Sequence, residues 1–293
     1  MINLLITGAS GMIGSRFLRL LPNDFQLVKN IDRTEGLDIL DYPGLSTALS
    51  SAKVDAIVHM AAFTDVNAAA EQEGKPDGMC FQINVLGTKN IIKLAKQLDC
   101  RLIHISTDYV FDGAKPEQYI ETDKPNPIEW YGKTKYEAEK IVMGSDINWC
   151  IARTAYPFLA EFPGKLDLVR SRIKQMKEGN LPPQFTDHII TPTFVDQLSG
   201  ALFKLIRSKA VEIYHLTGDT SLSDFDLSVN IAKRFGFDET KIAKSSLSEF
   251  NQSAPRPYQQ RMAMSNQKFE SQFGDTFSSF PEALATMKKQ LEN

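Results

Sequence analysis

The chain has 293 residues, of which 42% are hydrophobic and 24% are charged, and this ordinary globular composition gives ample material for a core. Its net charge of −3 excludes a strong overall attraction to nucleic acid or to an anionic membrane surface. The apolar segment 2–6 follows Met1 with no basic stretch, and no apolar run approaches the roughly 20 residues that span a bilayer. We therefore expect a cytoplasmic protein with no nucleic-acid partner and no membrane partner.

Short apolar runs alternate with amphipathic segments over the first half of the chain. This part of the sequence predicts strands at residues 2–7, 26–31, 55–61, 101–106 and 147–153. Between them it predicts helices at residues 12–21, 42–51, 78–98 and 130–143. Such alternation predicts an α/β fold of the Rossmann type, a doubly wound parallel sheet with helices on both faces.

The pattern changes after Arg153. Here the sequence predicts one further strand at 211–216 and helices at 166–178, 195–206, 223–235 and 281–291. We expect residues 1–155 to form an NAD(P)-binding Rossmann domain to which residues 192–220 return. Residues 156–191 and 221–293 are then expected to form a smaller, partly discontinuous C-terminal lobe that binds substrate at the carboxyl edge of the sheet.

A glycine-rich turn joins the first predicted strand to the first predicted helix. Gly8, Gly11 and Gly14 have the spacing G-x-x-G-x-x-G, and the turn also contains Ser10, Met12 and Ile13. Glycines let the backbone approach a pyrophosphate, and the helix N-terminus adds free N–H groups and a positive dipole end. The position of the turn between a strand and a helix predicts binding of NAD(H) or NADP(H).

Two neighbouring residues give opposite indications about the choice of cofactor. Asp32 ends the second predicted strand, where a carboxylate binds the ribose 2′-hydroxyl and repels a 2′-phosphate. Arg33 follows, and an arginine at this place pairs with a 2′-phosphate. The sequence leaves NAD and NADP both open.

Tyr131 and Lys135 lie four residues apart, on one face of a predicted helix. A phenol is a weak acid, but a nearby ammonium stabilises its phenolate, so we expect Lys135 to lower the pKa of Tyr131. Tyr131 then donates a proton to a carbonyl oxygen as a hydride reaches the carbon. Thr107, at the end of the preceding strand, brings a hydroxyl to the same edge of the sheet, where it can share the charge of the oxyanion.

These motifs resemble those of the extended short-chain dehydrogenase/reductases, and within them the dTDP-4-dehydrorhamnose reductases. The likeness covers nearly the whole chain and includes the run Ser-Thr-Asp-Tyr-Val-Phe-Asp-Gly at 106–113. The other matching segments are the glycine turn, 37–39, 61–66, Asn84, Tyr131 with Lys135, 192–193 and 256–257.

The resemblance implies an NAD(P)H-dependent reductase of a nucleotide-linked 4-keto sugar with the catalytic residues Thr107, Tyr131 and Lys135. It implies that Asn84 supports the site and that Arg256 approaches the diphosphate of the sugar nucleotide. The remaining residues that it places on the cofactor are Asp38, Ile39, Ala61, Ala62, Thr64 and Asn84, together with Tyr131 and Lys135. On the substrate it places Thr107, Asp108, Tyr109 and Tyr156.

The sequence departs from the family pattern at two places in the substrate region. The reductases usually carry Ser-Trp after the Arg-Thr pair, whereas this chain has Ala155-Tyr156-Pro157. The loop before the Pro-Thr motif usually contains a glycine, and here it reads Phe-Thr-Asp-His-Ile-Ile-Thr at 185–191. The sequence therefore supports reductase chemistry better than it supports a rhamnose substrate.

Other readings remain open at this point. An epimerase or dehydratase of the same superfamily shares the tyrosine–lysine pair. A non-catalytic, cofactor-binding regulatory subunit is a third possibility, because the beta subunit of methionine adenosyltransferase resembles the same reductases. The four histidines and three cysteines have no metal-ligand spacing, so no metal site is expected. A homodimer is possible.

Overall fold

The computed structural model describes residues 1–292 of the chain and contains a six-stranded parallel sheet in the order β10-β5-β4-β3-β1-β2. The predicted doubly wound Rossmann-type sheet is therefore confirmed. Because β2 and β3 pair with opposite sides of β1, the winding direction reverses at β1. The strands are β1 (Ile2–Thr7), β2 (Phe25–Ile31), β3 (Ala56–His59), β4 (Arg101–Thr107), β5 (Trp149–Thr154) and β10 (Ile213–His215).

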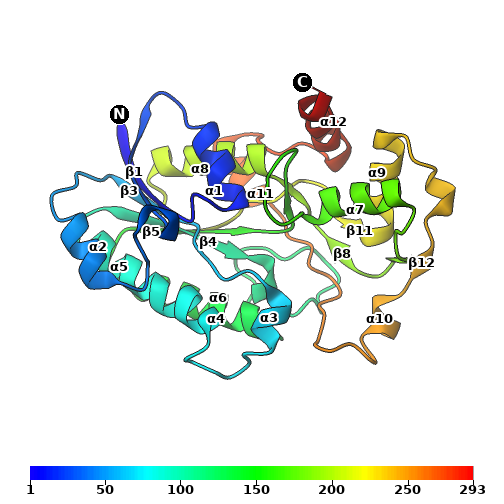
Figure 1. Ribbon diagram of the computed structural model, residues 1–293, viewed down its shortest axis with the longest axis horizontal. Coiled ribbons are helices and arrows are strands. Elements are labelled where there is room, and N and C mark those ends of the chain that lie inside the picture. Colours follow the sequence, from blue (N-terminus) through cyan, green and yellow to red (C-terminus); the bar gives the residue numbers. More distant parts are fainter. Residues whose placement is uncertain (293) are drawn as a thin grey trace.

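Helices cover both faces of this sheet (Figure 1). One face packs against α1 (Met12–Arg19) and α8 (Val195–Ser208), with α11 (Gln267–Phe273) beside β10. The opposite face packs against α2 (Tyr42–Ala48), α5 (Thr88–Gln97) and α6 (Trp130–Met143). Strand residues alternate between these layers: the Leu4 and Ile6 side chains join the first apolar cluster and Leu5 joins the second.

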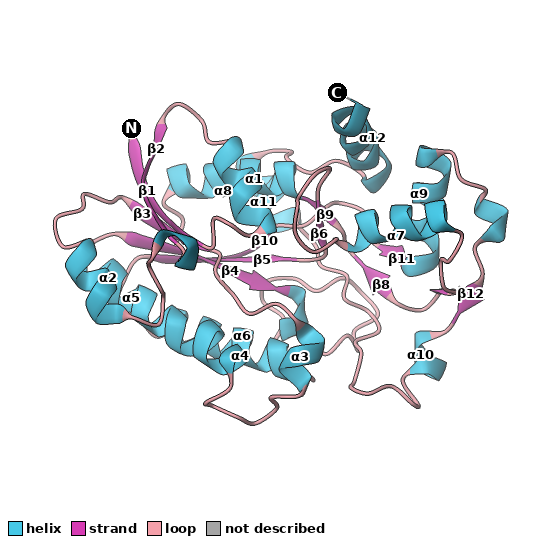
Figure 2. Cartoon of the chain, viewed as in Figure 1, coloured by secondary structure: helices cyan, strands magenta, loops and turns pink. Residues whose placement is uncertain are grey.

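A smaller lobe lies beyond the carboxyl ends of the central strands, at the right of Figure 2. Its core consists of apolar side chains from α7 (Leu168–Glu178), α9 (Asp224–Phe235) and α12 (Phe280–Glu292). Short strands and turns complete it: β6 (Pro157–Phe158), β7 (Gln184–Phe185), β8 (Ile189–Ile190), β11 (Leu222–Ser223), η4 (Glu239–Lys241), β12 (Lys244–Ser245) and α10 (Leu247–Phe250). Strand β6 pairs with β9 (Thr193–Phe194), which leads directly into α8.

The segment predicted as one helix at 78–98 is divided in three. It comprises α4 (Met79–Phe81), a π-helical turn η2 (Gln82–Gly87) and then α5. A π turn inserts one extra residue into helical pairing and is frequent at functional sites. The remaining short elements are η1 (Arg33–Glu35), α3 (Val66–Ala70) and η3 (Asp108–Val110).

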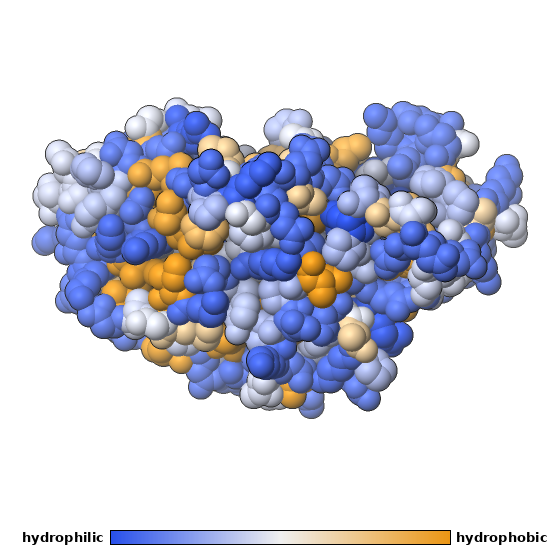
Figure 3. Space-filling model, turned by 90° about the horizontal axis from the view of Figure 1, so that it is seen from below, coloured by the Kyte–Doolittle hydropathy of each residue, from blue (hydrophilic) through white to orange (hydrophobic). Residues whose placement is uncertain are grey.

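The surface seen from below differs in hydropathy between its two ends. Hydrophobic residues gather on the left, where the parallel sheet and its helices lie, and the lobe on the right is mostly hydrophilic (Figure 3). Over residues 1–292, no helix combines the length and apolar character needed to cross a bilayer. The three cysteines are free and buried.

Candidate active site

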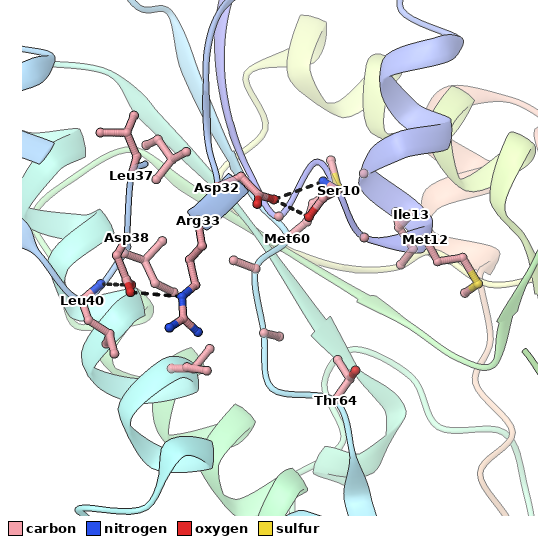
Figure 4. Close-up of a pocket in the computed structure, with 18 of the residues that line it drawn as sticks. Ser10, Met12, Ile13, Asp32, Arg33, Leu37, Asp38, Leu40, Met60 and Thr64 are labelled. Atoms are coloured by element: carbon pink, nitrogen blue, oxygen red, sulfur yellow. Dashed lines mark hydrogen bonds and ion pairs between the residues drawn. The ribbon is translucent and has the colours of Figure 1, made fainter. Parts of the chain in front are cut away.

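A cavity of about 440 Å³ opens at the carboxyl ends of β1, β2 and β3, where the winding of the sheet reverses. This is the place where open α/β sheets bind their ligands. Figure 4 shows that the side chains around it come from the glycine turn, from the end of β2 and from the segment after β3. Thirteen of the residues predicted to bind the cofactor line it: Gly8, Ser10, Gly11, Met12, Ile13, Gly14, Asp32, Arg33, Asp38, Ile39, Ala61, Ala62 and Thr64.

The glycine turn gives this cavity a wall made of backbone. Gly8 has φ +72°, and a Cβ there would lie 2.7 Å from the backbone nitrogen of Ala61. A Cβ on Gly14 would overlap the Gly8 carbonyl. Gly11 is the N-cap of α1 and offers no capping side chain, so the first N–H groups of the helix face the cavity. A dinucleotide pyrophosphate fits this uncapped, Cβ-free turn.

Asp32 is fixed at the end of β2 by four hydrogen bonds. Its Oδ2 accepts from the Ser10 backbone nitrogen and hydroxyl, at 3.2 and 2.5 Å, and its Oδ1 accepts from the backbone nitrogen and hydroxyl of Thr34, at 3.1 and 2.9 Å. Burial raises the pKa of Asp32, but these hydrogen bonds outweigh burial and hold the pKa below its usual value. A carboxylate is thus fixed on the cavity wall.

Arg33 lies beside this carboxylate but is much freer. Its side chain is 74% exposed, and its Nε lies 3.4 Å from the Asp38 carboxylate, as the dashed line in Figure 4 marks. An exposed ion pair of this kind contributes little to stability. The guanidinium can therefore leave Asp38 for another anion at low cost.

Asn84 does not line the cavity but holds one of its walls. Its Oδ1 accepts from the Phe63 backbone nitrogen at 2.8 Å, and its Nδ2 donates to the Phe63 carbonyl at 3.2 Å and to the Thr134 hydroxyl at 2.9 Å. The side chain is buried and lies in the π turn. Asn84 thus ties the loop after β3 to helix α6, which carries Tyr131 and Lys135.

Tyr131 and Thr107 meet at the next strand end along the sheet. Tyr131 lies in the first turn of α6, where the Glu129 carboxylate accepts hydrogen bonds from the backbone nitrogens of Tyr131 and Gly132, at 2.8 and 2.6 Å. Burial raises the pKa of Tyr131 well above its usual value, and a hydrogen bond with Thr107 opposes this rise only in part. The expectation that Lys135 lowers this pKa is therefore wrong for the protein without bound ligands, because desolvation of the phenol dominates.

The Lys135 ammonium points into the sheet. Its Nζ donates to the Ile105 carbonyl at 2.7 Å and lies 3.4 Å from His104 Nε2. Burial lowers the pKa of Lys135 to about 8, so most molecules carry the charge at neutral pH. Within this structure Lys135 interacts with the backbone of β4, and neither Lys135 nor Tyr131 lines the cofactor-sized cavity.

Asp108 and Tyr109 extend the group around Tyr131. Asp108 is 2% exposed, and burial raises its pKa to about 7. The Tyr109 ring stands edge-on to the Tyr131 ring, with 5.5 Å between ring centroids. Burial raises the pKa of Tyr109 to about 12. The carboxyl end of β4 thus collects an acid and two phenols in a poorly solvated place.

The two remaining residues predicted to bind substrate lie on the lobe side. The Tyr156 ring centroid is 6.5 Å from that of Tyr109, so Tyr156 continues the aromatic group. Arg256 stacks over the Tyr258 ring at 3.7 Å and donates to the Asn67 Oδ1 at 2.9 Å. Arg256 is close enough to Tyr109 and Glu129 to lower the pKa of each, although other effects dominate both values.

Several residues around the site have no recognisable signal in the sequence. Cavity-lining side chains such as Met60, Met79 and Pro157 carry no motif, and only their positions after strands could have indicated them. Glu129 was missed because glutamate is not a preferred N-cap residue. Among residues 1–292, no group of three or more His, Cys, Asp or Glu side chains lies close enough to hold a metal ion.

Comparison with known proteins gives one consistent result. Residues 2–293 match the family described as the RmlD substrate binding domain. A dTDP-4-dehydrorhamnose reductase of Aggregatibacter actinomycetemcomitans is 31% identical over 251 residues, covering 83% of this chain and 81% of that protein.

Two solved structures are similar over nearly their whole length. A dTDP-4-dehydrorhamnose reductase of Clostridium acetobutylicum has a TM-score of 0.89 at 28% identity, covering 100% of both chains. A dTDP-4-dehydrorhamnose reductase of Bacillus anthracis, solved in complex with NADP, has a TM-score of 0.89 at 26% identity and covers 99% of this chain and 100% of that one.

Proposed function

The chain belongs to the RmlD substrate binding domain family, and on this premise we propose that it reduces the 4-keto group of a nucleotide-linked sugar with NADH or NADPH. The observation that carries the proposal is the position of the Thr107–Tyr131 pair on the same sheet edge as the dinucleotide-type cavity. Asn84 joins the loop at the cavity to the helix that carries Tyr131. The similar reductases make dTDP-4-dehydrorhamnose the first substrate to test.

We assign the catalytic roles as follows. A dinucleotide held in the cavity would supply a hydride for the carbonyl carbon. Tyr131 keeps its phenolic proton at neutral pH because burial raises its pKa, and it donates that proton to the carbonyl oxygen. The Thr107 hydroxyl holds the same oxygen and shares its developing charge. Lys135, anchored on the Ile105 carbonyl, holds the nicotinamide ribose with its free N–H groups.

We assign the residues that line the cavity to the binding of the dinucleotide. The N-terminus of α1 binds the pyrophosphate, Asp32 and Arg33 contact the adenosine ribose, and Asp38 with Ile39 borders the adenine. Ala61, Ala62 and Thr64 also line the cavity, and we assign them to the nicotinamide half of the cofactor. We assign residues 1–155 and 192–220 to the cofactor domain and residues 156–191 and 221–293 to the substrate lobe. Within that lobe Arg256 contacts the diphosphate.

The experiment that tests this function is a measurement of net cofactor consumption. A reductase oxidises one NAD(P)H for each sugar reduced, whereas an epimerase or dehydratase returns its hydride to the sugar and consumes none. A regulatory subunit binds the cofactor without turnover. Purified protein is mixed with dTDP-4-dehydrorhamnose and either NADPH or NADH. The cofactor oxidised is measured from the loss of NAD(P)H absorbance and is compared with the amount of reduced sugar formed. Stoichiometric oxidation is expected; cofactor binding without oxidation would overturn the proposal. We expect the protein to act in the cytoplasm, and a homodimer stays a prediction.

A further inference from the structure

Tyr156 has an unusual backbone conformation for an aromatic residue. Its φ is +43°, in the left-handed region that side chains with a Cβ seldom adopt. The strain is held in place on both sides: the Thr193 backbone nitrogen donates to the Tyr156 carbonyl at 3.2 Å, and the Thr193 hydroxyl donates to the Ala155 carbonyl at 2.7 Å. Strain of this kind persists where the surroundings over-determine a functional position.

The strained backbone directs the Tyr156 phenol toward a histidine of the lobe. Tyr156 Oη lies 3.2 Å from His188 Nε2, and His188 Nδ1 lies 2.8 Å from the Asp224 carboxylate. Asp224 is 4% exposed, and Arg172 on α7 adds a favourable charge interaction with it. The sheet pairing fixes this order, because Ile189 pairs with Ser223, which brings the preceding His188 beside the following Asp224.

The chemistry of the three groups sets the direction of the hydrogen bonds. A carboxylate only accepts, so the imidazole tautomer with its proton on Nδ1 is the one that donates to Asp224. The other ring nitrogen, Nε2, must then accept, and Tyr156 is its donor. With its proton committed to His188, the Tyr156 oxygen offers only lone pairs to any other group.

Tyr156 links the hydrogen-bonded His188 and Asp224 to the residues around Tyr131. Its ring centroid lies 6.5 Å from that of Tyr109, and the Tyr109 ring stands edge-on to the Tyr131 ring at 5.5 Å between centroids. The next residue, Pro157, lines the cofactor-sized cavity. Tyr156 therefore lies between Tyr131, the cavity-lining Pro157 and the lobe, and under the proposed function we expect the sugar of the substrate to lie here.

We propose that Tyr156, oriented by His188 and Asp224, accepts a hydrogen bond from a ring hydroxyl of the sugar and so selects sugars that carry this hydroxyl. This inference rests on the proposed reductase function and assigns His188 and Asp224 as positioning residues. A buried acceptor left without its donor is costly, so a sugar that lacks the hydroxyl should be bound and reduced about ten- to a hundredfold less well.

The test compares the natural 4-keto substrate with analogues that each lack one ring hydroxyl. In the wild-type enzyme, one analogue should lose about ten- to a hundredfold in kcat/KM, mainly through KM. In Tyr156→Phe this loss should shrink to less than about threefold, because the variant has no acceptor to leave unpaired. Calorimetric affinities for the corresponding reduced nucleotide sugars should show the same pattern without turnover.

Two further variants separate positioning from mere structure. In Asp224→Asn the amide can donate to Nδ1, which would turn Nε2 into a donor and Tyr156 into a donor toward the sugar. A deoxyfluoro analogue, whose fluorine accepts but cannot donate, should then be reduced better relative to the natural substrate by Asp224→Asn than by the wild type. His188→Gln, whose amide oxygen can still accept from Tyr156, should restore discrimination relative to His188→Ala. Tyr214→Phe, which removes a phenol that donates to Gln272 at 2.7 Å in the Rossmann domain, is the matched control and should discriminate like the wild type.

The outcomes are distinguishable. If the wild type reduces no nucleotide-linked 4-keto sugar, the proposed function fails and this inference fails with it. If the wild type reduces such sugars but no single deoxy analogue is disfavoured, or if Tyr156→Phe discriminates as the wild type does, this inference alone is wrong.

Discussion

The Thr107 hydroxyl donates a hydrogen bond to the Asp108 Oδ1 across 2.9 Å, and both side chains are buried at the carboxyl end of β4. Asp108 Oδ2 has no hydrogen-bond partner among residues 1–292. As long as Asp108 is ionised, the Thr107 proton is committed to it and is withheld from a substrate oxygen. A protonated Asp108 can instead donate to Thr107 and release that proton toward the substrate.

This relationship predicts a pH dependence of the reduction. Burial raises the pKa of Asp108 to about 7, so the protonated form dominates below that pH and is lost above it. Lys135 loses its ammonium above about pH 8. We expect kcat/KM to fall from pH 6 to pH 9 with two ionisations. Asp108→Asn, whose amide donates at every pH, should keep only the one near 8.

The control for this profile is Asp112→Asn. Asp112 accepts hydrogen bonds from Tyr119 and Asn126 outside the catalytic group, so its substitution should leave both ionisations in place. An unchanged two-step profile in Asp108→Asn would show that Asp108 does not govern Thr107.

Removal of the phenolic acid should slow the chemistry while sparing binding. Tyr131→Phe should lower turnover by about two or more orders of magnitude, since general acid catalysis contributes about 10²–10⁴-fold. Cofactor affinity and thermal stability should stay close to those of the wild type, because the phenol does not line the cavity. Near-normal turnover in a single-turnover experiment would remove Tyr131 from the mechanism.

A substitution at Gly11 tests whether the glycine turn binds the cofactor. A Cβ at this position meets only the Gly8 carbonyl oxygen, at 3.2 Å, so the fold should accept a small change, whereas a branched side chain would occupy the approach of a pyrophosphate. Gly11→Val should abolish NADH and NADPH binding in calorimetric titration.

Gly144→Val is the matched control for this prediction. Its Cβ has the same nearest neighbour, a backbone oxygen at 3.2 Å, but it lies at the end of α6, away from the cavity. It should bind cofactor normally. Equal cofactor affinity in both variants would mean that the turn has no role in binding.

The choice between NADH and NADPH depends on Asp32 and Arg33. The fixed Asp32 carboxylate disfavours a 2′-phosphate, and the exposed Arg33 can pair with one. We expect a modest preference for NADH with NADPH accepted. Asp32→Ala should raise the relative use of NADPH, and Arg33→Ala should lower it, measured as the ratio of kcat/KM for the two cofactors. A ratio that neither substitution changes would mean that these side chains do not meet the ribose.

Sequence patterns predicted the sheet well because its strands are short apolar runs separated by turns. The glycine turn could be located because a helix that opens on glycine directly after a strand has a distinct local signature. The division of the helix at 78–98 could not be predicted, since the π turn depends on contacts of Asn84 with Phe63 and Thr134, which are distant in sequence.

The electrostatics of the site were the least predictable feature. A spacing of four residues places Tyr131 and Lys135 on one helix face, but it does not show that the ammonium turns to the Ile105 carbonyl. Burial, which decides the pKa of the phenol, emerges only when β4, α6 and the lobe are packed together. The partners of Tyr156 were hidden for the same reason, because His188 and Asp224 meet only through the pairing of β8 with β11.

Under the proposed function, a hydride passes from the dinucleotide to the C4 carbonyl carbon of a nucleotide-linked sugar. The most direct test uses NADPH or NADH deuterated at the transferred position, with dTDP-4-dehydrorhamnose and the purified wild-type protein, and locates the deuterium by NMR. Hydride transfer to C4 predicts one deuterium at C4 of the product for each NADH or NADPH oxidised. Oxidation without deuterium at C4, or a changed sugar with no net cofactor oxidation, would contradict it.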